Sequence, residues 1–119
     1  MWVLDASAVL AFLHGERGAD VVSDSLADVS VVSAANWAEV LSKFSDEGED
    51  PDAIAEGVES EGALFSGLEV LPVTADDART IARLRPLTRS GGLSLGDRAG
   101  LALALRLGTL YRSLTYCPF

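Results

Sequence analysis

Short apolar runs alternate with longer stretches of helical periodicity along the whole chain. Buried strands are expected where the short runs fall, at residues 2–4, 29–32, 68–73 and 109–115. Helices are expected between and after them, at residues 7–14, 18–26, 34–46, 51–64, 74–86 and 94–108. Strands that alternate with helices predict an α/β domain, in which helices cover both faces of a central parallel sheet.

Capping and helix-breaking residues mark the ends of several of these helices. Ser33, Thr74 and Ser94 each precede a periodic apolar stretch and are typical helix N-caps. Pro86 is expected to kink or end the helix that Thr74 begins. The Ser-Gly-Gly sequence at 90–92 predicts a flexible loop before the last helix.

The order of elements also predicts where a site would lie. In open parallel sheets, sites form outside the carboxyl ends of the strands. Asp5 directly follows the first expected strand. The carboxyl ends of the other expected strands lie at the segments that begin at Ser33, Thr74 and Thr115. We therefore expect any site to combine side chains that are far apart in the sequence.

Length and composition favour one domain that spans residues 1–119. The chain has 119 residues, of which 49% are hydrophobic, and this is ample for a packed core. No apolar run approaches the roughly 20 residues of a membrane helix, and the first five residues do not resemble a secretory signal. We therefore expect a cytoplasmic protein with no membrane contact.

The scarcity of histidine and cysteine restricts the possible chemistry. With His14 and Cys117 as the only residues of their types, a Cys/His zinc site within one chain is excluded. A Ser-His-Asp triad would have to use His14, which is interpreted instead as a surface or capping residue near a helix end. Any catalysis must therefore come mainly from carboxylates.

Charge is divided unevenly along the chain, whose formal net charge is -9. Residues 1–78 carry 17 acids and two bases, whereas residues 79–119 carry seven arginines and a single acid, Asp97. A protein that is acidic as a whole has no general attraction to nucleic acid. The arginine-rich part is either a solvated helix face or a patch for phosphates or an acidic partner.

Three carboxylates are the candidates for a site. Each has a simpler interpretation: Asp5 as a carboxylate before a helix capped by Ser7, Glu39 as a solvated helix position, and Asp97 as part of a capping box with Ser94. If the three acids converge, their repulsion raises their pKa values unless a cation is present. Carboxylate oxygens suit Mg²⁺ or Mn²⁺, which can activate water and neutralise a phosphate, so the three together indicate nuclease chemistry.

Three blocks of the sequence resemble a known family. They read VLDASAVLA at 3–11, SAANWAEVL at 33–41 and LSLGDRAGLALA at 93–104. In this order and spacing they are similar to the PIN-domain ribonucleases, in particular to the VapC toxins of bacterial type II toxin–antitoxin systems. The resemblance covers nearly the whole chain. It implies a PIN-like three-layer α/β/α sandwich and a metal-dependent endoribonuclease that cleaves RNA.

The resemblance also implies roles for individual residues and for partners. Asp5, Glu39 and Asp97 would form the catalytic set, with Asp5 and Asp97 as direct ligands of Mg²⁺ or Mn²⁺. Ser7 and Asn36 would support the site with a hydroxyl and an amide group, and Thr115 retains the threonine of the family pattern. Apart from the resemblance, Arg98 follows Asp97 and is expected either to contact a phosphate of the substrate or to favour the site electrostatically. The family further implies a homodimer and a cognate antitoxin that masks the site, often with an arginine.

The end of the sequence departs from the family pattern. The family usually continues its last strand into a Leu-Thr-x-Asp segment with a fourth acid, followed by another helix and strand. Here Cys117, a poor magnesium ligand, stands at the position of that acid, and the last helix and strand are expected to be missing. The alternative function is therefore a catalytically weakened module that binds RNA or a partner protein. A response-regulator-like domain is disfavoured, because it needs a lysine after the last strand and Lys43 is the only lysine.

Overall fold

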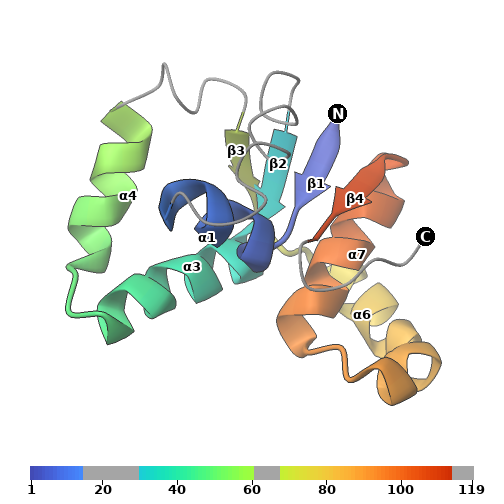
Figure 1. The fold of residues 1–119 in the computed structure, drawn as a ribbon. Helices are drawn as coiled ribbons and strands as arrows, with labels where there is room; N and C mark the ends of the chain where they lie inside the picture. Colours follow the sequence, from blue (N-terminus) through green and yellow to red (C-terminus); the bar gives the residue numbers. More distant parts are fainter. Residues whose placement is uncertain (15–29, 61–67, 114–119) are drawn as a thin grey trace.

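The computed structural model describes residues 1–14, 30–60 and 68–113 (Figure 1). Along the chain it contains β1 (Trp2–Leu4), α1 (Ala6–His14), β2 (Ser30–Ser33), α3 (Ala34–Asp46), α4 (Pro51–Ser60), β3 (Leu68–Leu71), α6 (Ala75–Thr88), the 3₁₀ turn η1 (Arg89–Gly91), α7 (Leu95–Leu107) and β4 (Leu110–Arg112). The expected alternation of strands and helices is confirmed. The helix expected at 18–26 lies outside the described residues, as do the last parts of the elements expected at 51–64 and 109–115.

The four strands form one parallel sheet in the order β3-β2-β1-β4. β1 therefore lies inside the sheet, between β2 and β4, and Asp5 follows its last residue. Because the strands are parallel, their carboxyl ends meet at one edge of the sheet. The beginnings of α1 and α3 lie at this edge, directly after β1 and β2 (Figure 1).

Helices cover both faces of the sheet, which confirms the expected three layers (Figure 1). Leu4 and Val32 pack in one core cluster with residues of α1 and α3, whereas their neighbours Val3 and Val31 pack against α7 on the other face. Successive strand residues point to opposite faces. Both faces are covered, so the inner strand β1 reads as a continuous apolar run, Trp2-Val3-Leu4. None of the described helices is long and apolar enough to cross a membrane.

Pro86 is the residue expected to kink or end helix α6. The helix does not end there but continues to Thr88 and then into η1, which occupies most of the segment predicted as a loop. Proline has no N–H to donate to the carbonyl group four residues earlier, which is that of Ala82. In the same turn, Nη1 of the buried Arg98 donates to the carbonyl oxygen of Ile81 at 2.9 Å. Helix α7 thus supplies a donor to the part of α6 that the proline disturbs.

An ion pair between the buried Asp77 and the exposed Arg106 joins α6 to α7. Asp77 is 4% exposed and forms the predicted type of capping box with Thr74, the N-cap of α6. Its carboxylate also accepts hydrogen bonds from Nε and Nη2 of Arg106 at 3.0 and 3.1 Å. Burial raises the pKa of Asp77, but the hydrogen bonds from Thr74 and Arg106 and the charge of Arg106 outweigh burial and lower it.

Removing Arg106 is expected to destabilise the fold. Arg106→Ala leaves Asp77 buried without its cation, so we expect the free energy of unfolding to fall by about 1–3 kcal/mol in urea denaturation at neutral pH. Because the folded-state pKa of Asp77 is lowered, its contribution is present above the unfolded pKa and is lost as the pH falls through the folded pKa. The difference between the two proteins should therefore shrink below about pH 4.

Arg79→Ala is the matched control for this measurement. Arg79 and Asp76 form an exposed ion pair at 3.9 Å on the same helix. Removing it should change the free energy of unfolding by less than about 0.5 kcal/mol. Equal losses in the two variants would contradict a stabilising role for the pair of Asp77 and Arg106.

Candidate acidic site

Asp5 is the buried centre of the candidate site. Its side chain is 2% exposed, and its Oδ1 accepts hydrogen bonds from the Ser7 hydroxyl at 2.7 Å and from the Ala8 N–H at 3.0 Å. Helix α1 therefore begins at Ala6 with Asp5 as its cap, and the expectation that Ser7 caps this helix is wrong. Ser7 instead donates to Asp5, so it lies beside the acid where the family resemblance places it.

Asp97 caps helix α7 from its first turn. Its Oδ2 accepts a hydrogen bond from the Ser94 N–H at 2.9 Å, and its own N–H donates to the Ser94 hydroxyl at 3.1 Å. The capping interpretation is therefore confirmed. The capping hydrogen bond uses Oδ2 of Asp97. The other carboxylate oxygen, Oδ1, accepts no hydrogen bond from the part of the chain that the structure describes.

Glu39 projects from α3 toward the beginning of α7. Its carboxylate lies so close to Gly96 that a Cβ atom added there would overlap Oε1 of Glu39. Burial raises the pKa of Glu39, and the negative charges of Asp97 and Asp5 raise it further. The three acids predicted from the sequence are therefore close enough to repel one another.

Asn36 joins the beginnings of α3 and α7. It is fully buried, and its Nδ2 donates to the carbonyl oxygen of Gly96 at 3.1 Å. Its Oδ1 accepts from the Ser33 hydroxyl at 2.7 Å, and its N–H donates to the same hydroxyl at 3.0 Å, so Ser33 is the N-cap that the sequence predicts. Asn36 thus supports the site by holding together the helices that carry Glu39 and Asp97.

Tyr111 is a part of the site that the sequence reasoning missed. It lies on β4, is 8% exposed, and places its hydroxyl 3.5 Å from Oδ2 of Asp5. Burial raises the pKa of Tyr111 above its ordinary range, and the charges of Asp5, Asp97 and Glu39 raise it further. A single tyrosine in an apolar run reads as a core residue. The signal that could have found Tyr111 is the register of β4 against β1, which pairs Tyr111 with Val3, two residues before Asp5.

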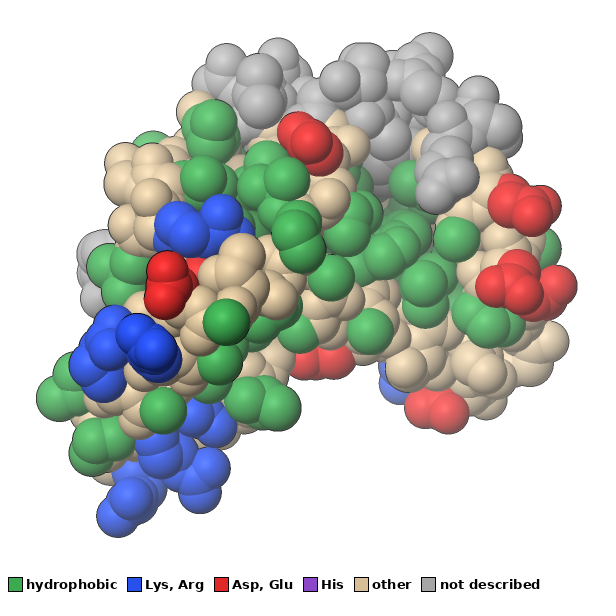
Figure 2. All heavy atoms as spheres, turned by 180° about the vertical axis from the view of Figure 1, so that it is seen from behind, with side chains coloured by type: hydrophobic (Ala, Val, Ile, Leu, Met, Phe, Trp, Pro, Cys, Tyr) green, Lys and Arg blue, Asp and Glu red, His purple; other side chains and the backbone are tan. Residues whose placement is uncertain are grey.

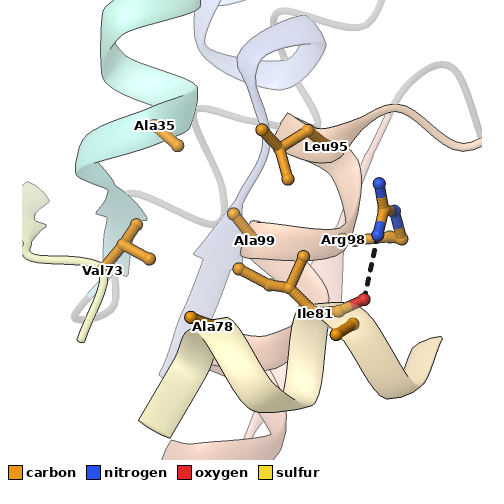
Figure 3. Close-up of a pocket in the computed structure, with 8 residues that line it drawn as sticks. Ala35, Val73, Ala78, Ile81, Leu95, Arg98 and Ala99 are labelled. Carbon is orange, nitrogen blue, oxygen red and sulfur yellow. Dashed lines mark hydrogen bonds between the residues drawn. The ribbon is translucent and has the colours of Figure 1, made fainter. Parts of the chain in front are cut away.

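Another expected support residue, Arg98, is not brought to the acids. Arg98 follows Asp97 in sequence, but its guanidinium group turns toward α6 and the carbonyl group of Ile81 (Figure 3). Arg98 therefore stabilises the contact between two helices, which corrects the expectation that it supports the substrate. Thr115 lies outside the described residues, as does Cys117.

The three carboxylates fit a hard divalent cation by their chemistry. Among the residues that the structure describes, no three acidic, histidine or cysteine side chains form a preformed metal-binding group. Mg²⁺ does not need such a group, because it keeps several waters and is commonly held by one or two carboxylates. Asp5 and Asp97, each held by capping hydrogen bonds, are the residues that could hold the ion directly.

An apolar pocket of about 500 Å³ lies between the beginning of α3, α6 and α7 (Figure 3). Small and aliphatic side chains dominate its lining, among them Ala35, Val73, Ala78, Ile81 and Leu95. None of the three acids lines it. On the face that Figure 2 draws, most of the basic side chains gather on the side of the molecule where α6 lies, and several acidic ones lie on the opposite side.

The fold and the acidic cluster together define a known class of protein. The family model of the PIN domain matches residues 2–110. The chain therefore belongs to the PIN domain family, as its three sequence blocks suggest.

Solved structures with the same fold include several toxins. VapC20 of Mycobacterium tuberculosis, a sarcin–ricin loop cleaving toxin, is 17% identical with a TM-score of 0.70, covering 92% of this chain and 85% of its own. A toxin–antitoxin complex from Klebsiella pneumoniae is 17% identical with a TM-score of 0.69, over 93% and 83% of the two chains. FitAcB from Neisseria gonorrhoeae is 24% identical with a TM-score of 0.68, over 95% and 86%. No protein with a curated description matches the chain.

Neutralising Asp97 is expected to lower the pKa of Glu39. Asp97→Asn keeps an oxygen for the capping hydrogen bond but removes a charge that raises this pKa. We expect the pKa of Glu39, followed by carboxyl ¹³C NMR, to move down toward the ordinary glutamate value. A carboxyl group whose pKa is raised by folding lowers the free energy of unfolding as the pH rises from its unfolded-state pKa to its folded-state pKa. We expect Glu39 to cause a smaller loss of this kind in the variant, because its folded-state pKa is raised less.

Asp52→Asn serves as the control for this titration. Asp52 is an exposed acid in the first turn of α4, and its charge does not contribute to the shift of Glu39. The pKa of Glu39 should be the same in this variant as in the wild type. A pKa of Glu39 that is unchanged in Asp97→Asn would show that the two carboxylates do not interact.

Proposed function

We propose that this protein is the VapC-type toxin of a type II toxin–antitoxin system, and that it is a metal-dependent endoribonuclease. The observation that carries the proposal is the convergence of Asp5, Glu39 and Asp97 at the carboxyl edge of a PIN-domain sheet. Three acids from distant parts of the chain, clustered without a histidine or lysine beside them among the described contacts, suit phosphodiester hydrolysis with a divalent cation.

In this proposal each acid has a distinct role. Asp5 and Asp97 hold Mg²⁺ or Mn²⁺ directly, and Glu39 acts through a water molecule. The bound ion supplies activation of water and neutralises charge on the phosphate. Ser7 and the Ala8 N–H fix the orientation of Asp5. Glu39, whose carboxylate lies beside the beginning of α7, would take a proton from water.

The neighbouring structures support RNA as the substrate class and an antitoxin as the partner. One similar toxin cleaves the sarcin–ricin loop, and another is part of a toxin–antitoxin complex. A cluster of carboxylates can accept an arginine from a partner through charge-assisted hydrogen bonds, as it can accept a metal ion. The proposal also includes a single domain over residues 1–119, a homodimer and a cytoplasmic location.

Asp5→Asn tests the metal site and the activity together. Asparagine is also a good helix cap, so the variant should fold, but it lacks the charge that a cation needs. We expect Mn²⁺ affinity in calorimetry to fall at least tenfold and cleavage of an RNA panel to fall by about 100-fold or more. Asp52→Asn is the control for both measurements and should match the wild type.

The outcomes of this experiment separate the two candidate functions. Unchanged Mn²⁺ affinity in Asp5→Asn would contradict the proposed metal site. If the wild type binds Mn²⁺ through Asp5 but cleaves no RNA, the catalytically weakened binding module becomes the better description.

Coexpression with the product of the neighbouring reading frame tests the toxin role. We expect the two proteins to purify as a complex whose melting temperature exceeds that of this chain alone, because binding to the folded state stabilises it. Asp97→Asn should weaken the complex if an arginine of the partner pairs with the acids. Failure to form any complex with that product would remove the main support for a toxin–antitoxin pair.

A further inference from the structure

Strand β4 delivers a hydroxyl group to the acidic cluster. The backbone N–H of Asp5 donates to the carbonyl oxygen of Arg112 at 3.1 Å, which fixes the acid to the end of β4. One residue earlier on that strand, Tyr111 turns toward α7, where its ring packs in the core with Val3 and Leu103. Its hydroxyl emerges from this core beside Oδ2 of Asp5.

The ring of Tyr111 needs a glycine on the facing helix. A Cβ atom at Gly100 would lie 2.9 Å from Cε2 of Tyr111 and 2.9 Å from Oδ1 of Asn36, closer than side chains tolerate without movement. Gly100 therefore lets α7 approach both residues. Since Asn36 also holds the first turn of α7 through Gly96, the ring of Tyr111 helps to set how far this turn, with Asp97, lies from Asp5.

The two oxygens of Asp5 have different partners. Oδ1 accepts from Ser7 and from the N–H of Ala8, whereas Oδ2 faces the hydroxyl of Tyr111. Within the described part of the chain no other hydrogen bond to Oδ2 is formed. A phenol donates one hydrogen, and a carboxylate oxygen that accepts it keeps a second lone pair for a cation. Hydrogen-bond donors outside the ligand set orient metal ligands in this way in many sites.

We propose that Tyr111 is a positioning residue of the acidic site, whose hydroxyl orients Oδ2 of Asp5 and whose ring spaces Asp5 from Asp97. The inference rests on the proposed function, because it concerns the same metal site. It gives β4 a role in that site that needs no fourth carboxylate. The strand contributes a neutral donor to a cluster that already carries three repelling charges.

Tyr111→Phe tests this role, because it keeps the ring and removes the hydroxyl. With the full chain, we expect Mn²⁺ affinity in calorimetry to fall about tenfold, the loss that removal of a donor outside the ligand set commonly causes. Adding Mn²⁺ to the wild type should perturb the ultraviolet absorption of tyrosine, and this difference spectrum should disappear in the variant. A tyrosine that only fills the core would produce neither result.

Two further variants control for stability and for folding. Thr109→Val removes another hydroxyl at the beginning of β4, which donates to the Met1 carbonyl at 2.7 Å, at the opposite end of the sheet from the acids. Its Mn²⁺ affinity should equal that of the wild type even if its melting temperature falls. Gly100→Ala keeps the hydroxyl but pushes on the ring and on Asn36, so it should weaken Mn²⁺ binding and also tests the proposal if Tyr111→Phe fails to fold.

The results distinguish failure of the inference from failure of the proposed function. If the wild type binds Mn²⁺ through Asp5 and both Tyr111→Phe and Gly100→Ala bind it equally well, the role of Tyr111 is overturned and the metal site stands. If the wild type binds no Mn²⁺, the proposed metal site is overturned, and the positioning role falls with it.

Discussion

The close approach of α7 to the carboxyl edge of the sheet is the constraint on which the acidic cluster depends. Gly96 and Gly100 lie one helical turn apart and therefore share a face. At the first, the carboxylate of Glu39 occupies the space of a missing side chain, and at the second, Tyr111 and Asn36 do so. A glycine in a helix costs about 0.5–1 kcal/mol relative to alanine. Here the two missing side chains leave the space in which residues from α3, α7 and β4 come together.

The same hydrogen bonds serve both the fold and the candidate chemistry. Asp5 and Asp97 each cap a helix, and capping fixes the carboxylate in a defined orientation. A carboxylate with one oxygen held in this way presents the other in a predictable direction. The structural and functional interpretations of these acids therefore do not compete, because in the proposed site the cap would orient the carboxylate that binds the ion. Glu39 has no such hydrogen bond among the described residues, and it is the acid whose pKa shift reflects burial and its neighbours' charges.

Local sequence signals predicted much of the fold and of the site. Apolar runs located the strands, and Ser33, Thr74 and Ser94 marked the helix starts, because caps and periodicity act within a few residues. Asp5 was found after a strand and Asp97 at a helix start, and the family resemblance joined Glu39 to them. Contacts between distant segments were not predictable in this way. The sequence does not show that the hydroxyl of Tyr111 lies beside Asp5, which is 106 residues away along the chain. Nor does it show that Arg98 points away from Asp97 and donates a hydrogen bond to α6. For the same reason the sequence left open whether α6 ends at Pro86 or continues past it.

The pairing of β1 with β4 has a consequence for when the site comes into existence. Asp5 is synthesised about a hundred residues before Asp97, Tyr111 and the Arg112 carbonyl group that fixes Asp5. Synthesis proceeds at about 5–20 residues per second, and contacts between distant segments form only after both have emerged. The acidic cluster is therefore incomplete until α7 and β4 have been made. A nascent chain cannot hold these three acids together before that point.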